Sequence, residues 1–265
     1  SSLRPSWMIR AGLFLYDHLA PRSRLAGSRT LDLRRDPVGE SLKERFAKGF
    51  AYSDAWVDDS RLVVLNALDA KERGARIRTR TRFVAARPDD GGWAATLQPA
   101  EGPAETVSAR VLVNAAGPWV DQVLRHGLDR QGPKNLKLVK GSHIVVPRLY
   151  EGGHAYILQQ PDRRIVFLIP YEERFTLIGT TDLCFDGEPA GVAITAAETT
   201  YLCDAANRFL RRPVAPNAVV WSYAGVRPLY DDLSGNPSAM TRDYVFDIEA
   251  GATPTISNGA PLTST

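Results

Sequence analysis

The sequence is poor in the residues that build disulfide frameworks and zinc sites. It has two cysteines, Cys184 and Cys203, with no CxxC pair and no histidine close to either. We expect two buried thiols and no metal site, because no group of His, Asp or Glu has ligand spacing. The 265 residues carry a formal net charge of only +3, with the basic residues scattered. A charge this weak does not indicate nucleic-acid binding.

Long apolar runs are also missing, since no stretch approaches the roughly 20 apolar residues of a membrane-spanning helix. The apolar run near the N-terminus is interrupted by Arg10 and Asp17, and no small-residue cleavage site follows it. It predicts a helix of about three turns rather than a signal peptide. We expect its apolar face to pack on a core, with a membrane surface as the alternative. An apolar fraction of 44% and a charged fraction of 24% are typical of a soluble globular protein with one large domain or two ordinary ones.

The first half of the chain predicts a helix followed by antiparallel strands. Acidic residues at 58–59 can cap a helix whose leucines recur at helical spacing, and Gly74 ends it. Period-2 alternation over 77–85 predicts a half-exposed strand. Turn-forming residues then separate it from further strands over 93–98 and 105–114.

The segment RVLVNAAGPW differs from these strands. Its apolar run ends in small residues, which is typical of a buried parallel strand. Pro118 follows at a position suited to the first turn of a helix. A strand, a small-residue turn and a helix start leave bare N–H groups at the carboxyl end of a strand, where open α/β sheets bind ligands. Alone, this is a weak indication of a ligand site.

After Gly132 the pattern changes. The runs 136–147, 155–160, 163–171 and 174–182 predict four short strands of an antiparallel sheet. A helix over 195–210 and one more strand over 217–228 follow. We expect a domain or lobe boundary near Gly132.

Seven short motifs, in this order, resemble one family. They are YSDAWVDDSRLVVLNA, VLVNAAGPWVDQV, KGSHIVVPR, RIVFLIPY, LIGTTD, YAGVRPL and TRDY. Each motif is modest, but together they are specific and extend from about residue 4 to residue 262. The chain is identified as a member of the FAD-dependent, respiratory, quinone-linked glycerol-3-phosphate dehydrogenases, within the D-amino-acid oxidase superfamily.

The resemblance implies an α/β (α+β) fold. Residues 1–132 would form part of a Rossmann-like FAD-binding domain with a β-meander, and residues 133–250 an antiparallel-sheet substrate-binding lobe. Residues 251–265 would lead back to the flavin domain. The family's N-terminal GxGxxG unit and its downstream Phe-Gly-Gly-Lys segment are not found in this sequence. We therefore expect a middle fragment of the enzyme that does not retain FAD or activity by itself.

The resemblance also implies the reaction, which is oxidation of sn-glycerol 3-phosphate to dihydroxyacetone phosphate. The cofactor would be FAD, and the electrons would pass to quinone. The whole enzyme would associate peripherally with the cytoplasmic side of a bacterial inner membrane, whereas the fragment would be soluble. Formation of a homodimer is left open. No nucleic-acid partner is implied.

Family motifs also mark candidate site residues. Arg227 and Arg242 would hold the substrate phosphate, for which planar guanidinium forks are well suited. His143 would accept the substrate hydroxyl proton or orient the substrate. Thr180 and Thr181 would line the substrate site, although ordinary caps and turns explain them equally well.

On the cofactor side, the resemblance implies that Ala115, Ala116 and Gly117 let the backbone approach FAD closely. Trp119 would pack near it. Two alternatives to this function stay open. One is another flavin oxidoreductase of the D-amino-acid and glycine oxidase superfamily, acting on an amine or a 2-hydroxy acid. The other is a non-catalytic module that binds anions.

Overall fold

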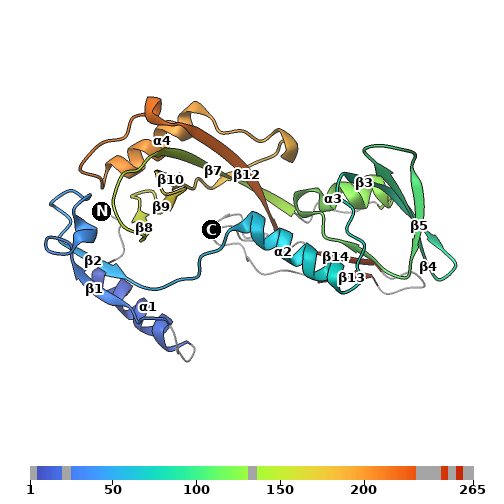
Figure 1. Cartoon of the computed structure of the whole chain (residues 1–265), viewed down its shortest axis with the longest axis horizontal. Coiled ribbons are helices and arrows are strands. Elements are labelled where there is room, and N and C mark those ends of the chain that lie inside the picture. The colour runs from blue at the N-terminus through green and yellow to red at the C-terminus, as the bar shows by residue number, and fades with distance from the viewer. Residues whose placement is uncertain (1–4, 20–24, 131–135, 231–245, 250–254, 259–265) are drawn as a thin grey trace. The chain divides into compact units, whose positions relative to one another are not determined.

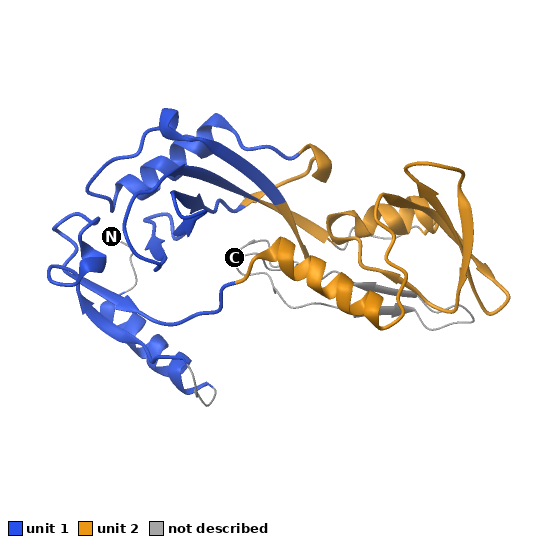
Figure 2. Cartoon of the chain, viewed as in Figure 1, with its two compact units in different colours: residues 1–56, 141–182, 192–225 blue, residues 57–140, 183–191, 226–265 orange. Residues whose placement is uncertain are grey.

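The computed structural model describes residues 5–19, 25–130, 136–230, 246–249 and 255–258 (Figure 1). These residues fold into two compact units (Figure 2). Unit 1 comprises residues 1–56, 141–182 and 192–225, and unit 2 comprises residues 57–140, 183–191 and 226–265. The predicted mixed α/β class with antiparallel sheets is confirmed. The predicted domain division at Gly132 stays a prediction.

The main sheet runs in the order β11-β7-β10-β9-β8, and β12 pairs with β7. Its strands match the predicted runs closely, because each is a short apolar segment between turn residues. Their bounds are β7 Leu136–Pro147, β8 Tyr156–Gln159, β9 Ile165–Tyr171, β10 Phe175–Gly179, β11 Leu183–Cys184 and β12 Trp221–Tyr230. Neighbours within the β7-β10-β9-β8 series are antiparallel.

The core of unit 1 lies between this sheet and helix α4, Ala196–Asn207 (Figure 1). Alternate residues of the strands, such as Ile144, Leu168 and Ile178, are fully buried against Leu202 of α4. This follows from the two-residue period of a strand and the apolar stripe of a helix. The helix begins with a capping box formed by Thr195 and Glu198.

Unit 1 also contains helix α1, Ser6–His18, and the hairpin of β1, Arg29–Asp32, with β2, Lys48–Ala51. The predicted N-terminal helix is confirmed, but none of its residues is buried. The expectation that its apolar face packs on a core is therefore wrong for the described residues. Trp7, Phe14 and Leu15 are more than half exposed. The Tyr16 hydroxyl donates to the carbonyl of Ser53 after β2, and Asp17 accepts the hydroxyl of Ser28 before β1.

Unit 2 contains helix α2, Asp59–Glu72, and a meander of β3, Thr81–Asp89, β4, Gly92–Pro99, and β5, Glu105–Ala109. The helix is confirmed, with Asp58 as its cap and Gly74 at φ +95° after its end. Its leucines are nearly half exposed, and no residue of α2 is buried among the described part of the chain. Strand β3 begins at Thr81, so the alternation over 77–80 does not form a strand.

Strand β6, Leu112–Asn114, pairs in parallel with β14, Thr255–Asn258, which pairs with β13, Phe246–Glu249. The predicted parallel strand is confirmed, although Val113 is 58% exposed and only Asn114 is buried. The expected helix after it is irregular. A 3-10 turn, Gly117–Trp119, leads into a short α-helical turn, Val120–Gln122, and a π-helical turn, Val123–Gly127.

Candidate active site

His143 lies in strand β7 of unit 1, in a slot that fits an imidazole ring closely. It pairs with Gly179, the last residue of β10. A Cβ atom built on Gly179 would lie 2.6 Å from Nε2 and 2.8 Å from Cγ of His143. On β12, Tyr223 stacks on the same ring, with ring centroids 4.8 Å apart and planes 8° apart. The missing side chain at 179 and the stacked Tyr223 together define where the His143 ring lies.

Thr180 follows Gly179 and lies beside the same part of β7. Its Oγ1 donates to the carbonyl of Thr181 at 3.0 Å, and a Cβ atom built on Gly141 would lie 2.6 Å from that Oγ1. The end of β10 therefore brings Thr180 next to the β7 segment that carries His143.

Thr181 is placed differently, because it is only 1% exposed. Its Oγ1 accepts the backbone N–H of Ser142 at 3.0 Å and donates to Glu198 Oε1 at 3.2 Å. This hydroxyl is thus engaged inside unit 1. A substrate-binding role for Thr181 stays a prediction that its hydrogen bonds do not favour.

The two predicted phosphate-binding arginines are not brought together by the described residues. Arg227 is half-buried in β12, directly before the buried Pro228. Arg242 lies outside the described residues. The convergence of Arg227 and Arg242 on one phosphate therefore stays a prediction.

The predicted cofactor segment follows β6 in unit 2. Buried Asn114 holds its turn, because its Nδ2 donates to the carbonyl of Val120 at 3.0 Å. Gly117 has φ +54°, and a Cβ atom there would meet nothing within 4 Å. Trp119 is 39% exposed, and its indole N–H donates to Glu188 Oε1 at 3.1 Å.

This arrangement fits the close approach of a flat, phosphate-bearing cofactor. The turn stands at the carboxyl end of a parallel strand, and the positive φ and open space at Gly117 leave the backbone accessible. Contact of Ala115, Ala116, Gly117 and Trp119 with the cofactor stays a prediction.

Sequence reasoning missed the residues around this part of the fold. Gly179 and Tyr223 lie against the His143 ring, and Ser142 and Glu198 hydrogen-bond to Thr181. The spacing of Thr195 and Glu198 is a capping-box signal and could have identified Glu198 as a helix-start residue. Nothing local marks Gly179 or Tyr223, because their role depends on the register of β10 and on the pairing of β12 with β7.

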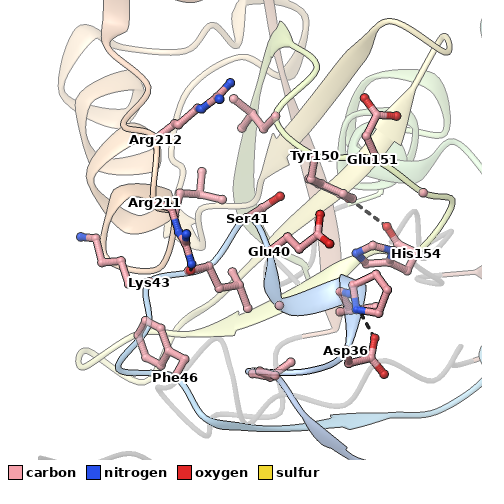
Figure 3. Close-up of a pocket in the computed structure, with 18 of the residues that line it drawn as sticks. Asp36, Glu40, Ser41, Lys43, Phe46, Tyr150, Glu151, His154, Arg211 and Arg212 are labelled. Atoms are coloured by element: carbon pink, nitrogen blue, oxygen red, sulfur yellow. Dashed lines mark hydrogen bonds between the residues drawn. The ribbon is translucent and has the colours of Figure 1, made fainter.

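Unit 1 also contains a polar cavity of about 1100 Å³, and none of its lining residues is a predicted site residue (Figure 3). Tyr150, His154 and Asp36 lie on one side of it, and Lys43 and Arg211 on the other. Burial lowers the pKa of His154. The hydroxyl of Tyr150 donates to the carbonyl of His154 at 2.9 Å. The cavity is a feature separate from the slot around His143.

Comparison with known proteins connects the chain to flavoenzymes. Residues 3–247 match the family described as FAD dependent oxidoreductase, DAO. A glycerol-3-phosphate dehydrogenase of Pseudomonas aeruginosa is 52% identical over 259 residues, covering 98% of this chain and 49% of that protein. A D-erythritol 1-phosphate dehydrogenase of Brucella abortus is 49% identical over 260 residues, covering 98% of this chain and 51% of that protein.

A solved structure shares the fold. The glycerol-3-phosphate dehydrogenase of Bacillus halodurans, complexed with FAD, superimposes with a TM-score of 0.70 and 29% identity over 86% of this chain and 44% of that one. The chain spans about half the length of the curated relatives it matches. The resemblance drawn from the seven motifs is thereby confirmed. With a family match over residues 3–247 and about half of its residues identical to those of these dehydrogenases, the chain belongs to the FAD dependent oxidoreductase family.

Proposed function

We propose that the whole protein carrying this chain oxidises sn-glycerol 3-phosphate to dihydroxyacetone phosphate, using FAD and passing the electrons to quinone. The observation that carries the proposal is the 52% identity to a glycerol-3-phosphate dehydrogenase over 98% of this chain. The match covers residues of both units. The chain contributes part of the cofactor site and part of the substrate site.

His143 is the residue that accepts the proton of the substrate hydroxyl. A neutral imidazole is suited to this step near pH 7, and a ring held in one orientation transfers a proton more efficiently than a mobile one. The stacking of Tyr223 and the absence of a side chain at Gly179 support this assignment, because they fix the plane of the ring. Thr180, beside it, can hydrogen-bond to a substrate oxygen.

Arg227 and Arg242 hold the phosphate. Arginine presents a planar fork of N–H donors that matches two phosphate oxygens at once, and it stays charged at any working pH. Half-burial of Arg227 strengthens its attraction for a dianion, because the charge is less screened by water. The neighbouring Pro228 restricts the backbone of Arg227 to extended conformations, so that the guanidinium starts from a fixed position.

Ala115, Ala116, Gly117 and Trp119 hold part of the cofactor. When bound, FAD supplies the acceptor for the hydride that leaves the carbon bearing the hydroxyl. The small residues let the backbone come close to the cofactor, and the half-exposed Trp119 packs at its side. Asn114 and Glu188 keep this turn in shape through their hydrogen bonds to Val120 and Trp119.

A second substrate is favoured by a specific observation, the 49% identity to a D-erythritol 1-phosphate dehydrogenase. Both compounds are polyol phosphates with a secondary hydroxyl group and a phosphate dianion. An arginine fork for the phosphate and a histidine for the hydroxyl proton suit either substrate. The two substrates differ in the length of carbon chain that the site must accommodate.

Contact with a membrane is part of the same proposal, because a quinone acceptor is dissolved in the bilayer. No helix among the described residues is both long and apolar enough to cross a membrane. The contact would be peripheral, on the cytoplasmic side of the inner membrane. The exposed Trp7, Phe14 and Leu15 of α1 support a surface contact of this kind. A homodimer also stays within the proposal.

The test is anaerobic bleaching of the flavin in the whole enzyme. We expect sn-glycerol 3-phosphate to bleach it, and D-erythritol 1-phosphate, D-amino acids and 2-hydroxy acids to do so much more slowly. Faster bleaching by D-erythritol 1-phosphate would assign the second substrate instead. Bleaching only by an amino acid or a 2-hydroxy acid would contradict the proposal.

The arginine assignment is tested in the same assay. Arg227→Ala should raise the substrate concentration needed for half-maximal bleaching by about tenfold or more, because an Arg–phosphate pair contributes roughly 1.5–3 kcal/mol. Its effect on the urea midpoint should be small. Arg82→Ala, at an exposed arginine of β3 in the same unit, is the matched control and should change neither quantity. Equal losses of substrate use and stability at Arg227 would indicate a structural arginine.

A further inference from the structure

We propose that Glu198 is a positioning residue of the active site, which acts through Ser142 and Thr181 on the place of His143 and Thr180. The inference deepens the proposed function, and it rests on the roles given there to His143 and Thr180. Glu198 touches neither substrate nor cofactor in this assignment. Its buried carboxylate connects three segments of unit 1, namely β7, the residues after β10 and the start of α4.

The two oxygens of the carboxylate have different partners. Oε2 accepts the backbone N–H of Thr195 at 2.9 Å and the Thr195 hydroxyl at 2.8 Å. The first of these bonds, together with the Glu198 backbone N–H that Thr195 Oγ1 accepts at 3.2 Å, forms the capping box of α4. Oε1 accepts the Ser142 hydroxyl at 2.7 Å and the Thr181 hydroxyl at 3.2 Å. A helix cap needs only the first oxygen. The second oxygen therefore has a separate task, which is to bind the strand and the turn.

Burial makes this second task energetically important. Glu198 is 5% exposed, Thr181 is 1% exposed, and Ser142 is fully buried. A carboxylate in such surroundings is tolerated only when hydrogen bonds replace its hydration, and bonds to a charged acceptor are shorter and stronger than neutral ones. The two hydroxyl groups are thus held firmly rather than merely placed nearby.

The network lies at a break in the antiparallel pairing of β7, between its pairs with β10 and its pairs with β11. Gly179 and His143 are the last pair of the β10-β7 register. Just beyond it, the Thr181 hydroxyl accepts the Ser142 N–H at 3.0 Å, and Glu198 binds both residues. Side chains thus replace a strand partner at this point of β7. They attach the turn to the segment that carries the proposed proton acceptor, in addition to the pairing of Leu183 with Lys140 that follows.

The alternation of side chains along β7 explains how Glu198 can influence His143 without contacting it. Ile144 and Val146 pack into the core with α4, so Ser142, on the same face of β7, points toward Glu198. His143 then points to the opposite face, where Tyr223 stacks on it. Fixing Ser142 fixes the backbone of its neighbour His143. Fixing Thr181 does the same for Thr180.

The test compares three variants of the whole enzyme. Glu198→Gln keeps the side-chain volume but replaces one of the two carboxylate oxygens by an NH2 group. This group cannot accept the hydrogen bonds that the oxygen accepts. Ser142→Ala removes a single hydroxyl on the Oε1 side and disturbs the fold less. Thr195→Ala is the matched control, because it removes a donor to Oε2 and weakens only the helix cap. All three should lower the urea midpoint.

Turnover and histidine reactivity separate positioning from stability. We expect kcat of Glu198→Gln and Ser142→Ala to fall about tenfold or more with little change in KM, since small displacements of a proton acceptor reduce rates strongly. Thr195→Ala should keep kcat within about twofold of the wild type, because its loss is limited to a helix cap. The rate of His143 modification by diethyl pyrocarbonate, followed by peptide mass spectrometry, should change several-fold in the first two variants only. His18, His126 and His154 serve as references in the same sample.

The inference is overturned if Glu198→Gln and Ser142→Ala keep both kcat and His143 reactivity at the wild-type level. It is also overturned if Thr195→Ala reduces kcat as much as they do. The reactivity measurement needs no substrate. If the wild-type enzyme does not oxidise glycerol 3-phosphate, the proposed function fails, while altered His143 reactivity still supports the positioning by Glu198.

Discussion

The contact between Gly179 and His143 makes a sharp prediction for Gly179→Ala. Gly179 is not in the left-handed backbone region, so its φ does not disfavour alanine. At such positions Gly→Ala commonly stabilises a protein by about 0.4–1 kcal/mol. Here the new methyl group would lie 2.6 Å from Nε2 and 2.8 Å from Cγ of His143, far inside van der Waals contact. This steric clash should therefore make Gly179→Ala destabilising instead of stabilising.

The ring has little room in which to move away. Tyr223 stacks on it at a centroid distance of 4.8 Å, so a shift of the imidazole must displace Tyr223 or rotate His143 out of its slot. Overpacking of this kind destabilises proteins by about 1–3 kcal/mol. A shift of the proposed proton acceptor by about 1 Å should lower kcat/KM up to a hundredfold. We expect both effects in Gly179→Ala.

Urea unfolding and steady-state kinetics of the whole enzyme measure the two effects. Gly153→Ala is the control, because a Cβ atom there meets nothing within 4 Å; it should be neutral or slightly stabilising. A double-mutant cycle with His143→Ala identifies the cause, since removing the ring removes the clash. If Gly179→Ala destabilises the His143→Ala protein as much as the wild type, the steric reasoning is refuted.

Two further predictions concern the core and the polar cavity of unit 1. Leu168→Ala, at a fully buried leucine of β9, should lower the free energy of unfolding by about 2–5 kcal/mol in urea titrations, whereas Ile165→Ala, at an exposed position of the same strand, should lower it by less than about 1 kcal/mol. Burial lowers the pKa of His154, so the unfolded chain binds a proton at a higher pH than the folded one. The whole protein should therefore lose stability as the pH falls below about 6.5. In urea unfolding at pH 7 and pH 5, His154→Gln should reduce the difference in stability between the two pH values. An unchanged difference would contradict the assignment of this pH dependence to His154.

Secondary structure was predictable where local signals were strong. The bounds of β7 coincide with the apolar run 136–147, and α2 and α4 lie within their predicted helices. The prediction for α1 was right about its helical conformation and wrong about its burial. Periodicity showed that α1 has an apolar face, but no local signal shows whether another element covers that face, and none of its residues is buried.

The site was predictable only as a set of chemical groups. Family motifs predict site roles for His143 and Thr180, and the fold brings both residues to the same end of the β10-β7 pair. They did not mark Gly179, Tyr223 or Glu198, whose proposed roles depend on register and packing between distant segments. A glycine in a strand is locally only a weak strand former. Its value at position 179 is the space it leaves for a ring from the neighbouring strand.

Two physical routes could connect Glu198 to His143, and the structure favours one of them. A carboxylate can act through its charge, which favours a protonated imidazole, or through the geometry it imposes. The charge of Glu198 is directed into hydrogen bonds with Ser142, Thr181 and Thr195, on the face of β7 opposite to His143. Geometry should therefore dominate. In Glu198→Gln, kcat/KM should fall at every pH while the pH of its half-maximal value stays the same. A shift of that midpoint to lower pH with an unchanged maximum would mean that the charge itself is what the enzyme uses.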